Sequence, residues 1–321
     1  MTAAVLVDAA GARMGGAARY LDELRRYLAR TGREDVKVVG ATRGVDPTWL
    51  VRRELAWRAF RRRVALNNVG FLAPGSQRWT LLRNALHFLT EEEESRLDLS
   101  LRASIRREAI AVRLAARRSN VVVAPSTAMA DRIARVLPDL RSRVVVRPHP
   151  VSADPSPRLS REPAIVCPVL FAPYKHMADR LSELLAVLDG HADPAIRLRV
   201  TADEREAPAG IAGHPRVELL GRRTHQELRE LQARSRAIYF PTGLESFGWP
   251  LAEARVSGQP VIARDTPQNR EIAGAALCGF TAGDAGSLQR ATALALTRNV
   301  APNPAAFHPD AYFSWLLGPS S

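Results

Sequence analysis

Two glutamates, Glu245 and Glu253, stand eight residues apart in the stretch PTGLESFGWPLAEARVSGQPVIARD (residues 241–265). Pro250 lies between them, and proline is well tolerated in the first turn of a helix and poorly tolerated in its interior. We therefore predict a strand, a loop and then a helix that begins close to Gly248. Glu245 then lies in the loop before the helix, and Glu253 lies one turn inside it.

A helix N-terminus presents unpaired backbone N–H groups and a partial positive charge, so it is an anion site. A phosphate bound there would have one carboxylate on each side, and each carboxylate can accept hydrogen bonds from hydroxyl groups. A nucleotide sugar has this layout, because its diphosphate joins a ribose to a second sugar. The stretch therefore predicts a nucleotide-sugar site. The competing interpretation is a pair of surface glutamates on an ordinary helix.

Short apolar strand signals alternate with helical signals along the chain, which is typical of parallel sheets covered by helices on both faces. The proline-rich stretch VSADPSPRLSREP interrupts this alternation. We predict an α/β protein with two Rossmann-like domains facing a cleft, where ligands bind beyond the carboxyl ends of the strands. The predicted parts are a first domain at 1–151, a linker at 152–163, a second domain at 164–305 and a terminal helix at 306–321.

The opening stretch resembles the E-x7-E signature of retaining GT-B glycosyltransferases, particularly glycosyltransferase family four. The matching residues are Glu245, Phe247, Gly248, Pro250, Glu253, Ala254, Gly258 and Pro260–Ala263. The resemblance is good over about residues 200–282 and loose over 1–150. It implies the GT-B fold, with the terminal helix packed back on the first domain. It also implies transfer of a sugar from a nucleotide-diphosphate donor to a hydroxyl group with retention of configuration.

The resemblance also implies roles for the residues around the helix start. Glu253 would bind the ribose hydroxyls, and Glu245 would bind the sugar hydroxyls at the reacting centre. Backbone N–H groups near Phe247 and Gly248 would meet the sugar or the phosphate, and Trp249 completes this part of the donor site.

Lys175 matches the family's phosphate-binding lysine. A cation at a helix start is unfavourable beside the helix dipole, which favours a functional role over a solvated lysine. The family usually carries an arginine five or six positions earlier, where Val169 and Leu170 stand here. We expect Arg264 or Arg147 to replace it.

Two features of the first half could face the donor. Gly15 and Gly16 follow the first predicted strand and open a helix, so that the backbone can approach a phosphate or an acceptor. His87 stands where a strand ends toward the predicted cleft, and the resemblance implies a histidine near the reacting sugar. We place His87 with Glu245 in the catalytic set, while a structural histidine remains the alternative.

The sequence predicts no metal ion and no other cofactor. It contains no Asp-x-Asp motif, and its histidines and cysteines lack zinc spacing. A helix N-terminus, Lys175 and arginines would instead stabilise the leaving group. Cys167 and Cys278 both fall in apolar runs, so we expect buried thiols in a reducing compartment.

The net charge of +13 favours polyanionic partners. The arginine-rich segments 48–66 and 100–118 are predicted helices with solvated faces, and they lack a nucleic-acid recognition motif, so we expect no nucleic-acid partner. An anionic membrane surface that carries a lipid-linked acceptor is a further candidate. Four apolar residues share one face of the first of these helices, which suits core packing or peripheral membrane binding. They are Leu50, Trp57, Phe60 and Val64.

The N-terminal residues resemble a first strand rather than a signal peptide, and no window reaches the roughly 18 apolar residues of a membrane span. We therefore predict a cytoplasmic protein, and a peripheral position on the inner face of the membrane is the alternative. The predicted activity is that of a retaining, metal-independent hexosyl- or other glycosyltransferase in cell-surface polysaccharide or glycoconjugate synthesis. A GT-B nucleotide-sugar epimerase and a non-catalytic basic protein that binds polyanions remain the alternatives.

Overall fold

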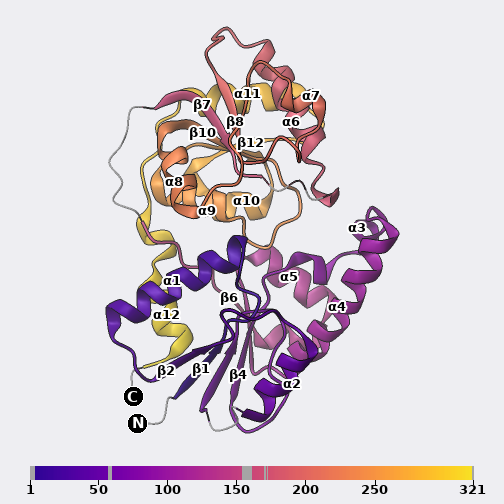
Figure 1. Ribbon diagram of the computed structural model, residues 1–321, viewed down its shortest axis with the longest axis vertical. Coiled ribbons are helices and arrows are strands. Elements are labelled where there is room, and N and C mark those ends of the chain that lie inside the picture. Colours follow the sequence, from indigo (N-terminus) through magenta and orange to yellow (C-terminus); the bar gives the residue numbers. More distant parts are fainter. Residues whose placement is uncertain (1–3, 57–59, 154–160, 170, 172, 320–321) are drawn as a thin grey trace. The chain divides into compact units, whose positions relative to one another are not determined.

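The computed structural model describes residues 4–56, 60–153, 161–169, 171 and 173–319 (Figure 1). The chain forms two compact units, Met1–Val151 with Phe307–Ser321 and Ser152–Ala306. Each unit contains a six-stranded sheet in which every strand pair is parallel. This confirms the predicted α/β class with two Rossmann-like domains. Most of the predicted linker lies outside the described residues.

The sheet of the first unit has the strand order β2-β1-β3-β4-β5-β6. Its strands are β1 (Val5–Asp8), β2 (Val36–Val39), β3 (Arg62–Ala65), β4 (Gln77–Leu81), β5 (Val121–Ala124) and β6 (Val144–Val146). Its helices are α1 (Gly15–Thr31), α2 (Pro47–Ala56), η1 (Ala85–Phe88), α3 (Glu91–Ser95), α4 (Leu99–Arg117), α5 (Thr127–Val136), η2 (Pro138–Arg143) and α12 (Pro309–Leu317), with η5 (Pro304–Phe307) at its border. Every residue of β1 is buried, as expected for a central strand with both faces covered.

The helix predicted over 48–66 is wrong beyond Ala56. There α2 ends, and the chain resumes as strand β3, which lies between β1 and β4. Val64 is fully buried in this strand, and Phe60 packs against a core cluster that includes Leu6. The predicted apolar helix face therefore does not exist, and its Trp57 lies outside the described residues. Strand pairing and core packing outweigh the helical spacing of this basic segment.

The expectation of solvated arginines is also wrong for two residues of this segment, Arg53 and Arg63. Arg53 is 1% exposed, and its guanidinium group lies 2.6 Å from the carboxylate of Asp8 at the end of β1. Arg63 is fully buried and donates to Ser76 and to the carbonyl of Ala73. These arginines therefore serve as core residues, since burying a charge is tolerated when it is paired and hydrogen-bonded.

The terminal helix α12 belongs to the first unit and packs beside α1, where Figure 1 shows it in yellow along the indigo helix. The Tyr20 hydroxyl donates to that of Tyr312 at 3.2 Å, and Phe313 makes edge contact with the Tyr20 ring. Burial raises the pKa of Tyr312 to about 12, so both hydroxyls keep their protons at neutral pH. The chain end therefore contributes to the core of the first unit.

The sheet of the second unit has the strand order β12-β11-β10-β7-β8-β9. Its strands are β7 (Glu162–Cys167), β8 (Arg197–Val200), β9 (Val217–Leu219), β10 (Ser235–Phe240), β11 (Val261–Arg264) and β12 (Leu277–Phe280). Its helices are η3 (Pro173–Lys175), α6 (Met177–Asp189), α7 (Ala209–Ala212), α8 (His225–Arg234), α9 (Trp249–Ser257), α10 (Pro267–Ala273), η4 (Gly274–Ala276) and α11 (Ala285–Thr297). Because the strands are parallel, the loops after β7, β10 and β11 leave the same edge of the sheet.

Both cysteines are buried and free, as predicted. Burial raises the pKa of the Cys167 thiol to about 12, which keeps it protonated and unreactive. Among the described residues, none of the helices combines the length and the apolar character that crossing a bilayer requires.

Candidate functional site in the second unit

The predicted strand, loop and helix around the two glutamates are confirmed. Strand β10 ends at Phe240, and α9 runs from Trp249 to Ser257, with Pro250 in its first turn. Gly248 caps the helix with a φ of 83°, a conformation that side chains rarely adopt. A Cβ atom there would also lie 2.8 Å from Leu251 Cδ1, so glycine is required at this helix start for two reasons.

Glu253 lies one turn inside α9 and is only 6% exposed. His225 Nε2 is 2.9 Å from Glu253 Oε1, and Gln232 Nε2 donates to Oε2 at 3.5 Å. Both partners belong to α8, the helix before β10. Hydrogen bonds to each oxygen hold the carboxylate in a fixed orientation, which suits a group that must recognise hydroxyls.

Glu245 lies in the loop between β10 and α9, and its Oε1 is 3.1 Å from Lys175 Nζ. Lys175 ends the short helix η3, two residues before α6, rather than starting α6 itself. Burial lowers the pKa of Lys175, but Glu245 and Tyr174 more than offset this effect and leave the pKa above its ordinary value. The two residues predicted for the sugar and the phosphate are therefore in contact with each other.

Three buried polar side-chain atoms lack a hydrogen-bond partner in the described part of the second unit, and all three lie at or just after the ends of β10 and β11. They are Thr242 Oγ1, Arg264 Nε and Gln268 Nε2. The Arg264 guanidinium lies against Gly243, where any Cβ atom would clash with it. Burial and the neighbouring Arg180 lower the pKa of Arg264. Such unsatisfied donors are costly, so their gathering at one edge of the sheet points to a ligand.

The aromatic residues of the loop pack inward. Phe247 is 1% exposed, and its ring meets that of Trp249 at a centroid distance of 5.7 Å. The two rings therefore pack against each other at the helix start, and the backbone N–H groups there remain the candidates for ligand binding. Of the two arginines proposed as replacements, Arg147 instead packs over the Trp315 ring of the first unit, which leaves Arg264 as the candidate.

In the first unit, Gly15 begins α1 after strand β1, with a φ of 56° and no atom within 4 Å of a Cβ placed on it. Gly16 follows it in the first turn of the same helix. The backbone at this helix start is therefore open to a ligand. Because β1 and β4 are parallel, these glycines and His87 lie beyond the same edge of the sheet.

His87 is 5% exposed and lies in η1, after β4. Its Nε2 is 3.3 Å from the amide nitrogen of Asn84 and 3.6 Å from Glu108, and its buried Nδ1 has no hydrogen-bond partner among the described residues. Burial lowers the pKa of His87 more than Glu108 raises it, so the ring is neutral at pH 7. A neutral ring with one unsatisfied nitrogen can hydrogen-bond a substrate.

The sequence did not point to His225, Thr242 or Gln268. His225 carries only a local signal, because Thr224 and Glu227 beside it form a capping box at the start of α8. Its contact with Glu253 spans 28 residues and has no signature in the sequence. No group of three or more His, Cys, Asp or Glu side chains among the described residues has the geometry of a metal site.

Residues 203–302 match the family model described as Glycosyl transferases group 1, and this span includes Glu245, Glu253, Arg264 and His225. The second unit carries a glycosyltransferase domain. No curated protein matches the chain in sequence.

Solved structures of similar fold cover nearly the whole chain. Sucrose-phosphate synthase from Thermosynechococcus elongatus aligns with a TM-score of 0.63 at 13% identity, over 97% of this chain and 95% of that one. WaaG, a glycosyltransferase involved in lipopolysaccharide biosynthesis, aligns with a TM-score of 0.64 at 16% identity, over 92% and 90%. The S. aureus MnaA–UDP structure aligns with a TM-score of 0.60 at 11% identity, over 99% and 97%. These likenesses confirm the predicted GT-B fold, and with the family match they support a glycosyltransferase.

Proposed function

We propose that the chain is a retaining glycosyltransferase of the family-four type, which transfers a sugar from a nucleotide diphosphate to a hydroxyl group without a metal ion. One observation carries this proposal. The start of α9 has a buried, doubly hydrogen-bonded carboxylate on one side and a carboxylate paired with a lysine on the other. Thr242 Oγ1, in the loop after β10, and Arg264 Nε, at the end of β11, have no hydrogen-bond partner among the described residues.

Each part of the donor has a group that can bind it. Glu253 accepts hydrogen bonds from the ribose hydroxyls, and the backbone N–H groups at the start of α9 bind the diphosphate. Arg264 and Lys175 add positive charge to the phosphates, and Glu245 accepts hydrogen bonds from the sugar. Charge-assisted hydrogen bonds of this kind are worth about 1.5–3 kcal/mol each.

The reaction proceeds by front-face displacement, which retains the configuration of the sugar. The acceptor oxygen bonds to the anomeric carbon on the face from which the phosphate departs, so no side chain needs to act as a covalent nucleophile. The departing phosphate oxygen takes the proton of the acceptor hydroxyl and acts as the base. The chain supplies position and charge stabilisation for the leaving group. In the first unit, the neutral ring of His87 can hydrogen-bond a sugar hydroxyl, and the open backbone at Gly15 and Gly16 can contact a phosphate or an acceptor.

The experiment replaces Glu253 with alanine and measures transfer from a panel of nucleotide sugars, with UDP sugars first because one structure of similar fold contains UDP. We expect a loss of more than tenfold with the protein still folded, since about 1.5 kcal/mol corresponds to a factor of ten. Glu230→Ala, an exposed glutamate on α8, is the control and should keep full activity. Unchanged turnover in Glu253→Ala would remove the donor-site assignment. Inversion at C2 of the donor without any acceptor would indicate an epimerase instead.

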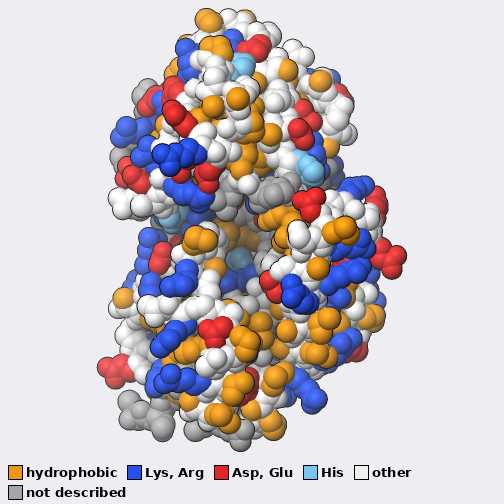
Figure 2. Space-filling model, turned by 45° about the vertical axis from the view of Figure 1, so that its right-hand side comes forward, with side chains coloured by type: hydrophobic (Ala, Val, Ile, Leu, Met, Phe, Trp, Pro, Cys, Tyr) orange, Lys and Arg blue, Asp and Glu red, His pale blue; other side chains and the backbone are white. Residues whose placement is uncertain are grey.

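We also propose that the first unit binds an anionic membrane surface on the cytoplasmic side, where a lipid-linked precursor of a cell-surface glycan supplies the acceptor hydroxyl. The exposed side of α4 carries Arg107 and the apolar residues Ile110 and Leu114, and the exposed Arg118 follows at the end of the helix. Figure 2 shows basic side chains interspersed with hydrophobic ones on the visible face of this unit. Such a mixture suits the interface of an anionic bilayer.

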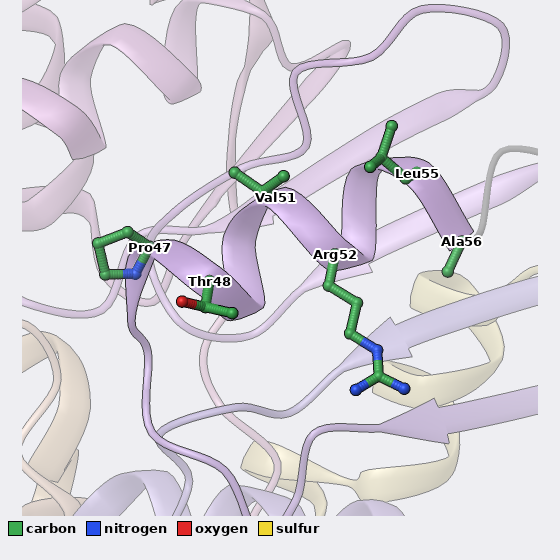
Figure 3. Close-up of a pocket in the computed structure, with 6 residues that line it drawn as sticks. All are labelled: Pro47, Thr48, Val51, Arg52, Leu55 and Ala56. Carbon is green, nitrogen blue, oxygen red and sulfur yellow. The ribbon is translucent and has the colours of Figure 1, made fainter.

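Helix α2 adds a second exposed apolar surface to the first unit. Val51 and Leu55 are 61% and 66% exposed, and they point the same way from the helix, beside an open pocket that Pro47 and Arg52 also line (Figure 3). This surface takes the place of the apolar face predicted from the sequence. Its basic and apolar composition supports the same membrane role as the exposed side of α4.

A further inference from the structure

The hydrogen bond between His225 and Glu253 can hold the carboxylate of Glu253 in one orientation. Glu253 is almost fully buried, and a buried carboxylate requires hydrogen-bond donors to remain charged. An ionised carboxylate only accepts, so His225 Nε2 carries the proton in this contact. The ring meets Oε1 at 2.9 Å, whereas the amide of Gln232 meets Oε2 at the long distance of 3.5 Å. His225 is therefore the stronger of these two partners.

The helix that presents the imidazole ring is itself fixed. His225 is the first residue of α8, and the capping box formed by Thr224 and Glu227 holds this helix end. At the other end of α8, the Gln259 amide donates to the backbone carbonyls of Gln232 and Ser235. His225 and Gln232 thus both belong to one helix that is held at each end, and the carboxylate cannot rotate without losing their hydrogen bonds.

We propose that His225 is a positioning residue that sets the affinity of the site for the ribose of the donor, by holding Glu253 in the orientation that accepts the ribose hydroxyls. This inference rests on the proposed function. A carboxylate oxygen can accept more than one hydrogen bond, so a ribose hydroxyl can bind beside the imidazole. The contribution is the same in the ground state and the transition state, because the ribose is remote from the bond that breaks.

A second histidine–carboxylate pair in the same unit serves as the matched control. His214 Nε2 lies 3.2 Å from Asp189, but the Asp189 side chain is 54% exposed, against 7% for that of Glu253. An exposed pair of this kind contributes little, because water competes for both partners. His214→Ala should therefore leave nucleotide binding unchanged.

The test measures binding of UDP, GDP and ADP to the full chain by calorimetry, together with kcat and KM for the donor. For the nucleotide that the wild type binds, His225→Ala should raise Kd and KM about tenfold and change kcat less than about twofold. His225→Gln keeps a donor close to the position of Nε2 and should restore Kd to within about threefold of the wild type. Thermal melting checks that each variant is folded.

The 2′,3′-dideoxy analogue of the same nucleotide tests the route of the effect. Without ribose hydroxyls it cannot use Glu253, so wild type and His225→Ala should bind it equally. An equal loss of affinity for the nucleotide and for its dideoxy analogue in His225→Ala would overturn the inference. Unchanged affinity of His225→Ala for the nucleotide, or no recovery of affinity in His225→Gln, would also overturn it. A wild type that binds none of the three nucleotides would instead overturn the proposed function, on which the inference rests.

Discussion

The two units of the chain carry their charge in different ways. The first unit has 28 Lys and Arg against 16 Asp and Glu, whereas the second has 18 against 17. Almost the entire net charge of +13 therefore belongs to the first unit. The electrostatic field of a strongly positive unit attracts anions of any kind, whereas a nearly neutral unit binds an anion only through individual charged groups placed close to it. The comparison indicates that specificity for the donor lies in a few contacts of the second unit.

The two units also differ in how exposed one of their ion pairs is. Asp8 and Arg53 are sealed in the core, at 0% and 1% side-chain exposure, and no ligand can reach them. Lys175 and Glu245 remain about one fifth exposed, at 19% and 23%, so a ligand can exchange partners with them. The first pair stabilises the fold, and the second is available for chemistry.

The largest expected effect comes from removing the sealed carboxylate. Asp8 accepts hydrogen bonds from Arg53, Asn67, Trp49 and the Ala10 backbone. Asp8→Ala removes the closest counter-ion of a buried guanidinium and leaves only Glu54, whose Oε1 is 3.7 Å from Arg53 Nε. The loss should lower the free energy of unfolding of the first unit by about 3–5 kcal/mol. Hydrogen exchange in the full chain should show the loss in the first unit alone, with UDP still protecting the second.

The corresponding control is the double variant Asp8→Ala with Arg53→Met, which removes both charges and should recover part of the lost stability. Equal loss of protection in both units would show that the sealed pair does not act on the first unit alone.

A smaller effect is expected from Arg264, whose buried Nε has no hydrogen-bond partner within the described part of the chain. Arg264→Ala should weaken nucleotide-diphosphate binding by about 1.5–3 kcal/mol, because it removes a charge-assisted hydrogen bond to phosphate. Arg270→Ala is the matched control in the next helix, since Arg270 is exposed and already paired with Asp265. Equal calorimetric affinities for Arg264→Ala and the wild type would mean that another cation binds the phosphates.

The pH dependence of stability should arise mainly in the first unit. Burial lowers the pKa values of His87 and His149, so below about pH 6.5 the unfolded chain binds protons that the folded unit does not. The free energy of unfolding should therefore fall as the pH decreases, by about 1.4 kcal/mol per histidine and pH unit. Urea denaturation at pH 7.5, 6.5 and 5.5 measures this slope. His149→Phe should reduce it, and an identical slope in that variant would exclude the histidine as a cause.

The smallest effect concerns the exposed side of α4. Arg107→Gln should weaken binding to phosphatidylserine vesicles by about 1 kcal/mol, the typical contribution of one basic residue near an anionic surface. High salt should abolish the difference. Arg223→Gln in the second unit is the control and should sediment with vesicles like the wild type. Vesicle binding that ignores both salt and Arg107 would contradict the membrane proposal.

Local sequence signals predicted much of the fold. Pro250 lies in the first turn of α9, as predicted, and the alternating strand and helix signals form two parallel sheets with helices. The prediction for the segment around β3 was wrong because the spacing of its arginines is also typical of a solvent-exposed helix. The reason lies far away in the chain, since Arg53 is neutralised by Asp8 and strand β3 is paired with β1 and β4.

The candidate site divides in the same way. The resemblance to a family motif predicted Glu245, Glu253 and Lys175 as site residues, and the structure brings Lys175 and Glu245 into contact. His225 could not be predicted, since only the packing of α8 against α9 brings it to Glu253. Contacts between distant segments depend on tertiary structure, which no local pattern encodes.

A crystal structure of the protein soaked with UDP, and with GDP in parallel, tests the central claim most directly. The account predicts the diphosphate at the backbone N–H groups that begin α9, with the ribose hydroxyls within hydrogen-bond distance of Glu253 and Arg264 turned to the phosphates. A nucleotide bound elsewhere in the second unit, with Glu253 still contacted only by protein groups, would contradict it.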